Sequence, residues 1–118
     1  MKSNDILVEF FEAAESNEIE KVSQLIKEKG VDVNSRDNNN EDRTILHIAA
    51  LKGFEDLIHI LVNQFGADIN IEDKLGEVPL HVAADSHHIQ IVKFLVEKGS
   101  HYSEDVVDIL GASEGKNL

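Results

Sequence analysis

One seven-residue pattern returns in this chain, and it constrains the fold more than any other feature. Residues 44–50 read TILHIAA and residues 78–84 read VPLHVAA, so the Leu, the His and both Ala keep their places at an offset of 34 (78 − 44). The register continues beyond the heptad, because the apolar residues 57, 58, 61 and 62 align at the same offset with 91, 92, 95 and 96. A period of this length is typical of a solenoid built from repeated supersecondary units.

A weaker copy of the pattern lies upstream. At an offset of 36 (49 − 13), Ala13 and Ala14 align with Ala49 and Ala50, and GVDVN at 30–34 aligns with GADIN at 66–70. The two extra residues fall between Asp37 and Thr44, where NNNED and the Arg after it take the place of the shorter KLGE. The sequence therefore predicts about three repeats, of which the first is degenerate.

Composition narrows the class of protein. The 118 residues suffice for one domain with a continuous core, and the absence of cysteine excludes disulfides and thiolate metal sites. The net charge is −12 and the 11 Lys and Arg form no basic run, which opposes binding to nucleic acid. The N-terminus lacks the apolar run of a signal peptide and no segment is apolar enough to span a membrane. We therefore expect an intracellular, cytoplasmic protein.

Each repeat reads as a pair of helices. ILHIAALKG predicts a short helix ended by Gly53, and FEDLIHILVNQFG predicts an amphipathic helix closed by Gly66. The first helix is lined by Ala and the second by larger Leu, Ile and Val, as expected where the first helices approach closely and the second fill the space between repeats. Thr44 is an expected N-cap; Val78 takes its place in the next repeat, where Pro79 partly compensates. The polar stretch GADINIEDKLGEVP between the pairs predicts an arm with a tight turn over 73–76.

These features together resemble the ankyrin repeat family, through TILHIAALKGFEDLIHILVNQFGADIN and VPLHVAADSHHIQIVKFLVEKG. The resemblance covers about residues 5–99. It implies an all-α ankyrin-repeat solenoid of about three helix-turn-helix repeats, with helices in two layers and short β-hairpin arms projecting from them. It also implies protein–protein interaction through the arm tips and inner helices, with no catalytic role and no cofactor.

The departures from the family pattern shape the expected boundaries. Phe10 and Phe11 replace the Leu and His of the motif, so the first repeat resembles an N-terminal cap. Ser103 begins an expected C-terminal capping helix, because terminal repeats need their core covered. The whole chain is interpreted as one domain, divided into a capping repeat at 1–35, repeats at 36–71 and 72–100, a cap at 101–112 and a frayed tail at 113–118.

The interhelical turns also differ between repeats. The position of Gly53 is taken by Asn17 in the first repeat and by His87 in the third. We expect His87 to adopt the positive φ that favours glycine.

Histidines offer the main alternative chemistry. The resemblance implies a structural role for His47 and His81, whose hydrogen bonds would tie each helix start to its neighbour, and for Asn34 and Asn70 at the arm bases. His87 and His88 lie near Asp85 in the sequence, with His101 as a further candidate ligand, and leave a metal-dependent or regulatory site as an alternative hypothesis. No nucleophile elbow, phosphate-binding glycine loop or HExxH is present, so no enzyme activity is expected.

The resemblance also implies which positions contact a partner: those beside the turn Asp, before the motif Thr and before the interhelical turn. These are Glu15, Ser16, Arg36, Asn38, Asn39, Arg43, Leu51, Lys52, Glu72, Lys74, Leu75, Glu77, Asp85 and Ser86. Leu51 and Leu75 are apolar among charged neighbours and are either anchors or scattered surface leucines. The NNNED insertion either extends the reach of its arm or is a flexible segment with no binding role.

The expected partner is a protein with a basic patch, because opposite charge accelerates association with so acidic a chain. The protein is expected to be a monomer that binds neither nucleic acid nor membranes. Two further alternatives stay open on the sequence: a host-directed effector of an intracellular microbe, and a fragment of a larger ankyrin protein.

Overall fold

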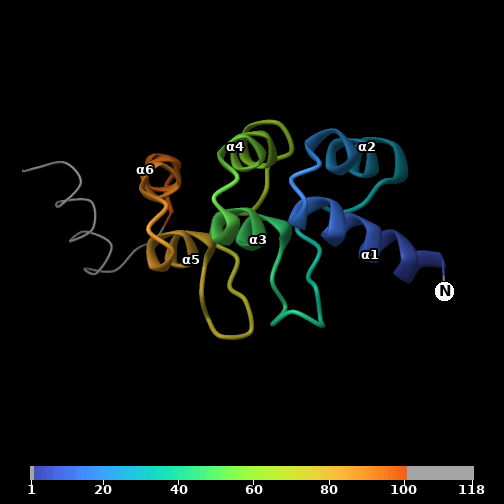
Figure 1. Ribbon diagram of the computed structural model, residues 1–118, viewed down its shortest axis with the longest axis horizontal. Helices are drawn as coiled ribbons and strands as arrows, with labels where there is room; N and C mark the ends of the chain where they lie inside the picture. The colour runs from blue at the N-terminus through green and yellow to red at the C-terminus, as the bar shows by residue number, and fades with distance from the viewer. Residues whose placement is uncertain (1, 101–118) are drawn as a thin grey trace, which may run out of the picture.

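The computed structural model of the protein describes residues 2–100. The expected cap at 101–112, including Ser103, and the tail at 113–118 lie outside these residues. The described chain forms helices that stack as three consecutive pairs (Figure 1). The helices are α1 (Lys2–Glu15), α2 (Ile19–Lys29), α3 (Ile45–Lys52), α4 (Glu55–Asn63), α5 (Pro79–Asp85) and α6 (Ile89–Glu97).

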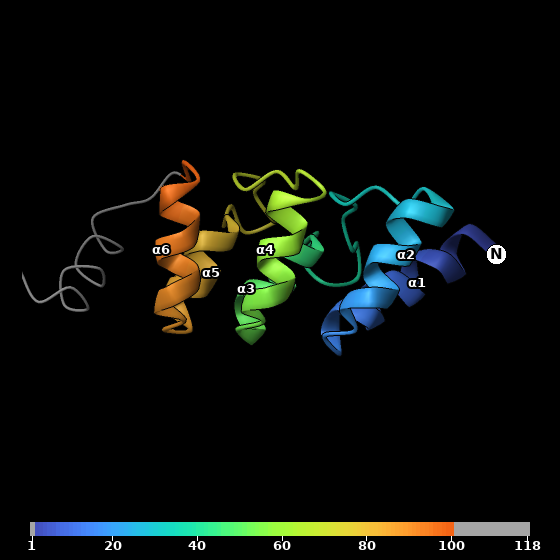
Figure 2. The same ribbon diagram turned by 90° about the horizontal axis from the view of Figure 1, so that it is seen from above.

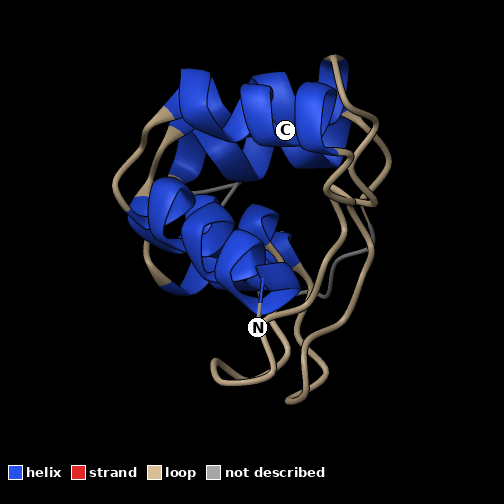
Figure 3. Cartoon of the chain, turned by 90° about the vertical axis from the view of Figure 1, so that its right-hand side faces the viewer, coloured by secondary structure: helices blue, strands red, loops and turns tan. Residues whose placement is uncertain are grey.

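The helices form two layers. The inner layer holds α1, α3 and α5, with α3 packed against both neighbours, and the outer layer holds α2, α4 and α6 (Figure 2). Viewed along the stack, the loops that connect successive pairs project together from one side of the layers (Figure 3). This is the all-α repeat solenoid that the sequence predicts.

Small and large residues have different roles in the packing of the layers. Ala49 and Ala50 of α3 are fully buried, and their small side chains let the inner helices approach closely. Leu57, Ile58 and Leu61 of α4 are also fully buried and fill the space between the layers. Large residues are buried in the inner layer as well, since Ile45 and Leu46 of α3 are at most 1% exposed, so the predicted alternation holds only for the Ala positions of the inner helices.

Left-handed residues end the inner helices at the three equivalent turns. Gly53 caps α3 with φ 81°, and Asn17 and His87 take φ 58° and 61°, which confirms the expectation for His87. Gly53 is also enclosed, since a Cβ added there would lie 2.7 Å from Cε1 of His88. α4, in contrast, ends at Asn63, before the predicted stop at Gly66, although Gly66 does adopt a positive φ of 65°.

The first repeat differs from the others in its inner helix. α1 runs over 14 residues against the 8 of α3, because the chain before Val8 continues as helix where the other repeats have an arm. Phe10 and Phe11 are both buried, with ring centroids 5.7 Å apart, at the positions of the motif Leu and His. Aromatic bulk thus fills the space that a hydrogen-bonded histidine occupies in the second repeat.

Two arms project between the pairs, at 30–44 and 64–78. The first closes with one isolated antiparallel bridge between Asp37 and Arg43, and the described residues contain no extended strand pair. The second turns tightly, with the Gly76 N–H donating to the Asp73 carbonyl at 3.0 Å, as predicted. The β-hairpins that the resemblance implies are therefore reduced to one bridge in the first arm and, in the second, to turn hydrogen bonds such as that from the Asp73 N–H to the Glu77 carbonyl at 2.9 Å.

Candidate protein-binding surface

The two arms are bonded to each other. The Arg36 guanidinium donates to the carbonyl of Asp42 at 3.1 Å and to that of Glu72, on the next arm, at 2.7 Å. The Lys74 N–H donates to the Glu41 carbonyl at 2.7 Å, so the insertion in the first arm contacts the second through its main chain. These bonds hold both arm tips in one relative position, which favours the hypothesis of a reaching arm over that of a flexible insertion.

A buried carboxylate organises the turn of the second arm. Oδ1 of Asp73 accepts from the N–H groups of Leu75 and Glu77, both at 2.9 Å, and Oδ2 accepts from Nε of Arg43 at 3.2 Å. Burial by itself would raise the pKa of Asp73, but these hydrogen bonds and the Arg43 charge outweigh it and lower the pKa below the ordinary 3.8. The carboxylate is therefore ionised at neutral pH and fixes the loop that presents Lys74 and Leu75.

His47 joins α3 to the same arm. Nδ1 accepts from the Thr44 N–H at 3.1 Å, so Nε2 must carry the hydrogen that it donates to the Glu77 carbonyl at 2.8 Å. The Thr44 hydroxyl in turn accepts from the His47 N–H at 3.4 Å, which completes a capping box and confirms the predicted N-cap. Burial of the ring lowers the pKa of His47 below 6.5, so the neutral form is favoured.

The predicted contact residues divide into exposed and supporting groups. Eleven of them have exposed side chains: Glu15, Ser16, Arg36, Asn38, Asn39, Leu51, Lys52, Glu72, Lys74, Leu75 and Asp85. Arg43, Glu77 and Ser86 are only partly exposed, and Arg43 pairs with Asp73. Arg36 and Arg43 thus brace the arms, whereas Asn38, Asn39, Lys74 and Leu75 stand at the tips.

Exposed apolar residues are few in the described chain. The large ones are Val8, Leu51 and Leu75, with exposed fractions of 52%, 41% and 64%. Leu51 lies in the last turn of the inner helix α3, and Leu75 lies at the tip of the second arm.

The sequence did not single out Val8. It lies on α1, where Leu7, Val8 and Phe11 face the first arm across a groove that Arg36 and residues 37–39 also line. By register Val8 corresponds to Thr44 and Val78, which are both buried, so the pattern indicates a core residue at this position. Val8 is exposed because the residues before it continue helix α1, where the second and third repeats have an arm.

Comparison with known proteins agrees with this geometry. A family model described as ankyrin repeats, in three copies, matches residues 10–106. The chain belongs to the ankyrin repeat family. Ankyrin repeats are a protein–protein interaction module and are generally non-enzymatic.

Several curated proteins are similar to this ankyrin chain over only part of their own length. A putative ankyrin repeat protein of Rickettsia bellii is 38% identical over 91 residues, which cover 76% of the chain and 49% of that protein. A putative glutaminase 2 of Caenorhabditis elegans is 30% identical over 117 residues, covering 97% of the chain and 19% of that protein. Human rabankyrin-5 is 34% identical over 70 residues, 59% of the chain and 6% of that protein. The chain thus spans about half or less of the relatives it matches.

The structure gives little support to the alternative metal site at the third interhelical turn. Nε2 of His88 lies 3.0 Å from the Leu51 carbonyl oxygen, so this ring bonds to the preceding ankyrin repeat, while His87 is exposed. Between residues 2 and 100 there is no group of three or more His, Cys, Asp or Glu that could hold a metal ion. His101 lies outside the described residues.

No helix of the described ankyrin repeats has both the length and the apolar character needed to cross a membrane.

Asn34 has the structural role that the family implies. Its side-chain oxygen accepts from the Asp68 N–H of the next repeat at 2.9 Å, which joins the bases of the two arms.

Proposed function

We propose that this ankyrin repeat domain binds a protein partner across the inner helices and arm tips, in a scaffolding, adaptor or regulatory role. The observation that carries the proposal is the placement of Val8, Leu51 and Leu75, which leaves the largest exposed apolar residues of the described chain on inner helices and an arm tip. Apolar side chains surrounded by charged ones are typical anchors of an interface.

The bonding between the arms supports the same proposal. Hydrogen bonds from Arg36 and from the Lys74 main chain fix the arms before a partner binds. Binding therefore costs less conformational entropy than it would if the arms had to be ordered in the complex. Asn38, Asn39 and Lys74 then supply polar contacts around the apolar anchors.

We further propose a monomer that recognises a basic patch and performs no chemistry itself. The charge of −12 favours such a partner by accelerating encounter. The likeness to the putative glutaminase supports no glutaminase activity here, because the chain covers only 19% of that protein. We attribute that likeness to shared ankyrin repeats.

A combined variant tests the surface. Partners are captured from cell lysate with the parent protein and identified by mass spectrometry, and the affinity of each is then measured with purified components. The variant Leu51→Ser, Lys74→Ala, Leu75→Ser should lose at least about 2 kcal/mol of binding free energy while unfolding at nearly the parent temperature, because all three side chains are exposed.

Matched controls make the result specific. The control variant Lys27→Ala, Gln64→Ala, Glu97→Ala also changes three exposed side chains, on or directly after the outer helices, and should bind as the parent does. Adding Val8→Ser to the inner variant should weaken binding further. Unchanged affinity in the inner variant would reject the proposed surface.

A further inference from the structure

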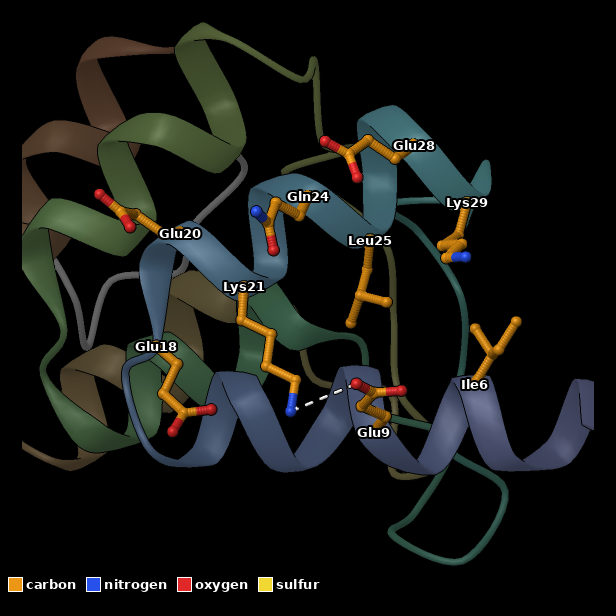
Figure 4. Close-up of a pocket in the computed structure, with 9 residues that line it drawn as sticks. All are labelled: Ile6, Glu9, Glu18, Glu20, Lys21, Gln24, Leu25, Glu28 and Lys29. Carbon is orange, nitrogen blue, oxygen red and sulfur yellow. Dashed lines mark ion pairs between the residues drawn. The ribbon is translucent and has the colours of Figure 1, made fainter.

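A second groove lies away from the arms, between α1 and α2 of the first repeat (Figure 4). It is open to solvent and has a volume of about 500 Å³, enough for a few side chains of a bound segment. The residues that line it are Ile6, Glu9, Glu18, Glu20, Lys21, Gln24, Leu25, Glu28 and Lys29.

The groove has an apolar patch between its two helices. Leu25 points from α2 toward α1, and Ile6 lies on the facing part of α1 (Figure 4). Leu25 is 6% exposed and Ile6 is partly buried. An aliphatic side chain seated between them would leave water without displacing any core residue.

The charge around this apolar patch is unbalanced. Lys21 pairs with Glu9 at 3.2 Å, so that pair is already neutral. Glu18, Glu20 and Glu28 make no salt bridge within the described chain, and Lys29 is the one other cation in the lining. The lining thus holds three such carboxylates and one such ammonium group, with Glu20 and Glu28 directed away from α1 (Figure 4). This excess of negative charge would attract cationic side chains and repel phosphates.

The acidic side of α2 borders a second depression as well. Glu20, Gln24 and Glu28 also line a groove that Ile60 and Gln64 of α4 complete. Glu20 and Glu28 are therefore accessible from two directions.

We propose that the α1–α2 groove binds a basic segment of a partner protein, in which an aliphatic side chain is flanked by Lys or Arg. The aliphatic group contacts Leu25 and Ile6, and the flanking cations pair with Glu18, Glu20 and Glu28. This groove uses the side of α1 that borders α2, whereas the first surface uses Val8, Leu51 and the arm tips, so each proposal can fail without the other.

Titration of the ¹⁵N-labelled protein with the peptide acetyl-Lys-Lys-Leu-Lys-Lys-amide at low salt tests this proposal. The expected result is a set of saturable amide shifts confined to α1 and α2. The variant Glu18→Gln, Glu20→Gln, Glu28→Gln should bind this peptide roughly tenfold more weakly. Each of the three exposed ion pairs that it removes contributes only part of this tenfold difference in affinity.

Two controls separate the groove from general attraction to an acidic protein. Glu55→Gln, Asp56→Asn, Glu97→Gln removes the same charge from exposed positions on the outer helices and should bind as the parent does. A peptide with Ser in place of its Leu should bind more weakly, because the apolar contact is lost. Shifts spread over the surface or centred on the arms, equal losses in both triple variants, or no saturable shift would each overturn the proposal.

Discussion

At the scale of single residues, His47 links helix to arm through one neutral ring. Protonation would add a hydrogen to Nδ1, which now accepts a hydrogen bond from the Thr44 N–H, and the two N–H groups would then oppose each other. The hydrogen bond from Nε2 to the Glu77 carbonyl would remain. The folded protein therefore resists protonation more than the unfolded chain does. This difference links the stability of the protein to pH.

The first prediction concerns this linkage. The pKa of His47 is lowered on folding, so its contribution is fully present above the unfolded value of 6.5 and is lost as the pH falls through the folded pKa. The variant His47→Gln should unfold more easily at neutral pH by about 1 to 3 kcal/mol, because buried backbone groups lose partners. Its free energy of unfolding should also fall less than that of the parent as the pH is lowered. Urea unfolding across that pH range measures both differences.

The matched control is His87→Asn. His87 is exposed and lies at the positive φ that Asn tolerates, so the free energy of unfolding of this variant should depend on pH as that of the parent does. Asp73 affects stability only at lower pH. Its pKa is lowered, so its contribution to stability is lost only as the pH falls through a value below 3.8. An identical pH profile in His47→Gln and the parent would exclude His47 as the source.

At the scale of helices and arms, the repeat register predicted most of the structure. The helix pairs follow from the shared Leu, Ala and apolar positions, because burial against a neighbouring repeat selects the same side chains each time. The extension of α1 to Lys2 was not predictable from the repeat register, because α3 and α5 begin only after an arm. Nor was the exposure of Val8, which follows from the helical conformation of the residues before it.

The roles of the arm residues needed three-dimensional information. Arg36 reads as a variable tip residue, yet its partner is the carbonyl of Glu72, in the next repeat. A pattern within one repeat shows nothing of bonds between repeats. The prediction of a partner surface therefore identified mostly exposed positions. It did not distinguish residues that hold the arms in place, such as Arg36 and Arg43, from residues at the arm tips.

The second prediction concerns the start of α5. Val78 takes the place of the N-cap and makes no side-chain hydrogen bond there, whereas Thr44 caps α3 in the same register. Val78→Thr should stabilise the protein by about 1 kcal/mol, because its hydroxyl can accept an N–H that α5 leaves without a side-chain cap. Denaturant unfolding measures the gain.

Val78→Ala is the control for this change, since it removes buried methyl groups without adding an oxygen. It should destabilise the protein by about 1 to 2 kcal/mol. If Val78→Thr were as unstable as Val78→Ala, packing of the valine and not the missing cap would decide the stability of this helix start.

At the scale of the whole molecule, excess negative charge opposes the stacking of repeats. The chain carries −12, and in its described part the salt bridges join Lys21 to Glu9, Lys52 to Glu15, and Arg43 to Asp73 and Glu77. The first two pairs are exposed and contribute little. Repulsion between carboxylates along the stack is therefore the larger electrostatic effect.

The third prediction follows from that imbalance. Adding sodium chloride should raise the melting temperature, with most of the rise complete by about 0.1 M, where the screening length falls to about 10 Å. The variant Glu55→Gln, Asp56→Asn, Glu97→Gln carries −9 (−12 + 3) and should show a smaller rise. A gain that instead continued linearly to high salt, equal in both proteins, would indicate an effect of salt on apolar burial. A fall in melting temperature would mean that the attractive pairs outweigh the repulsion.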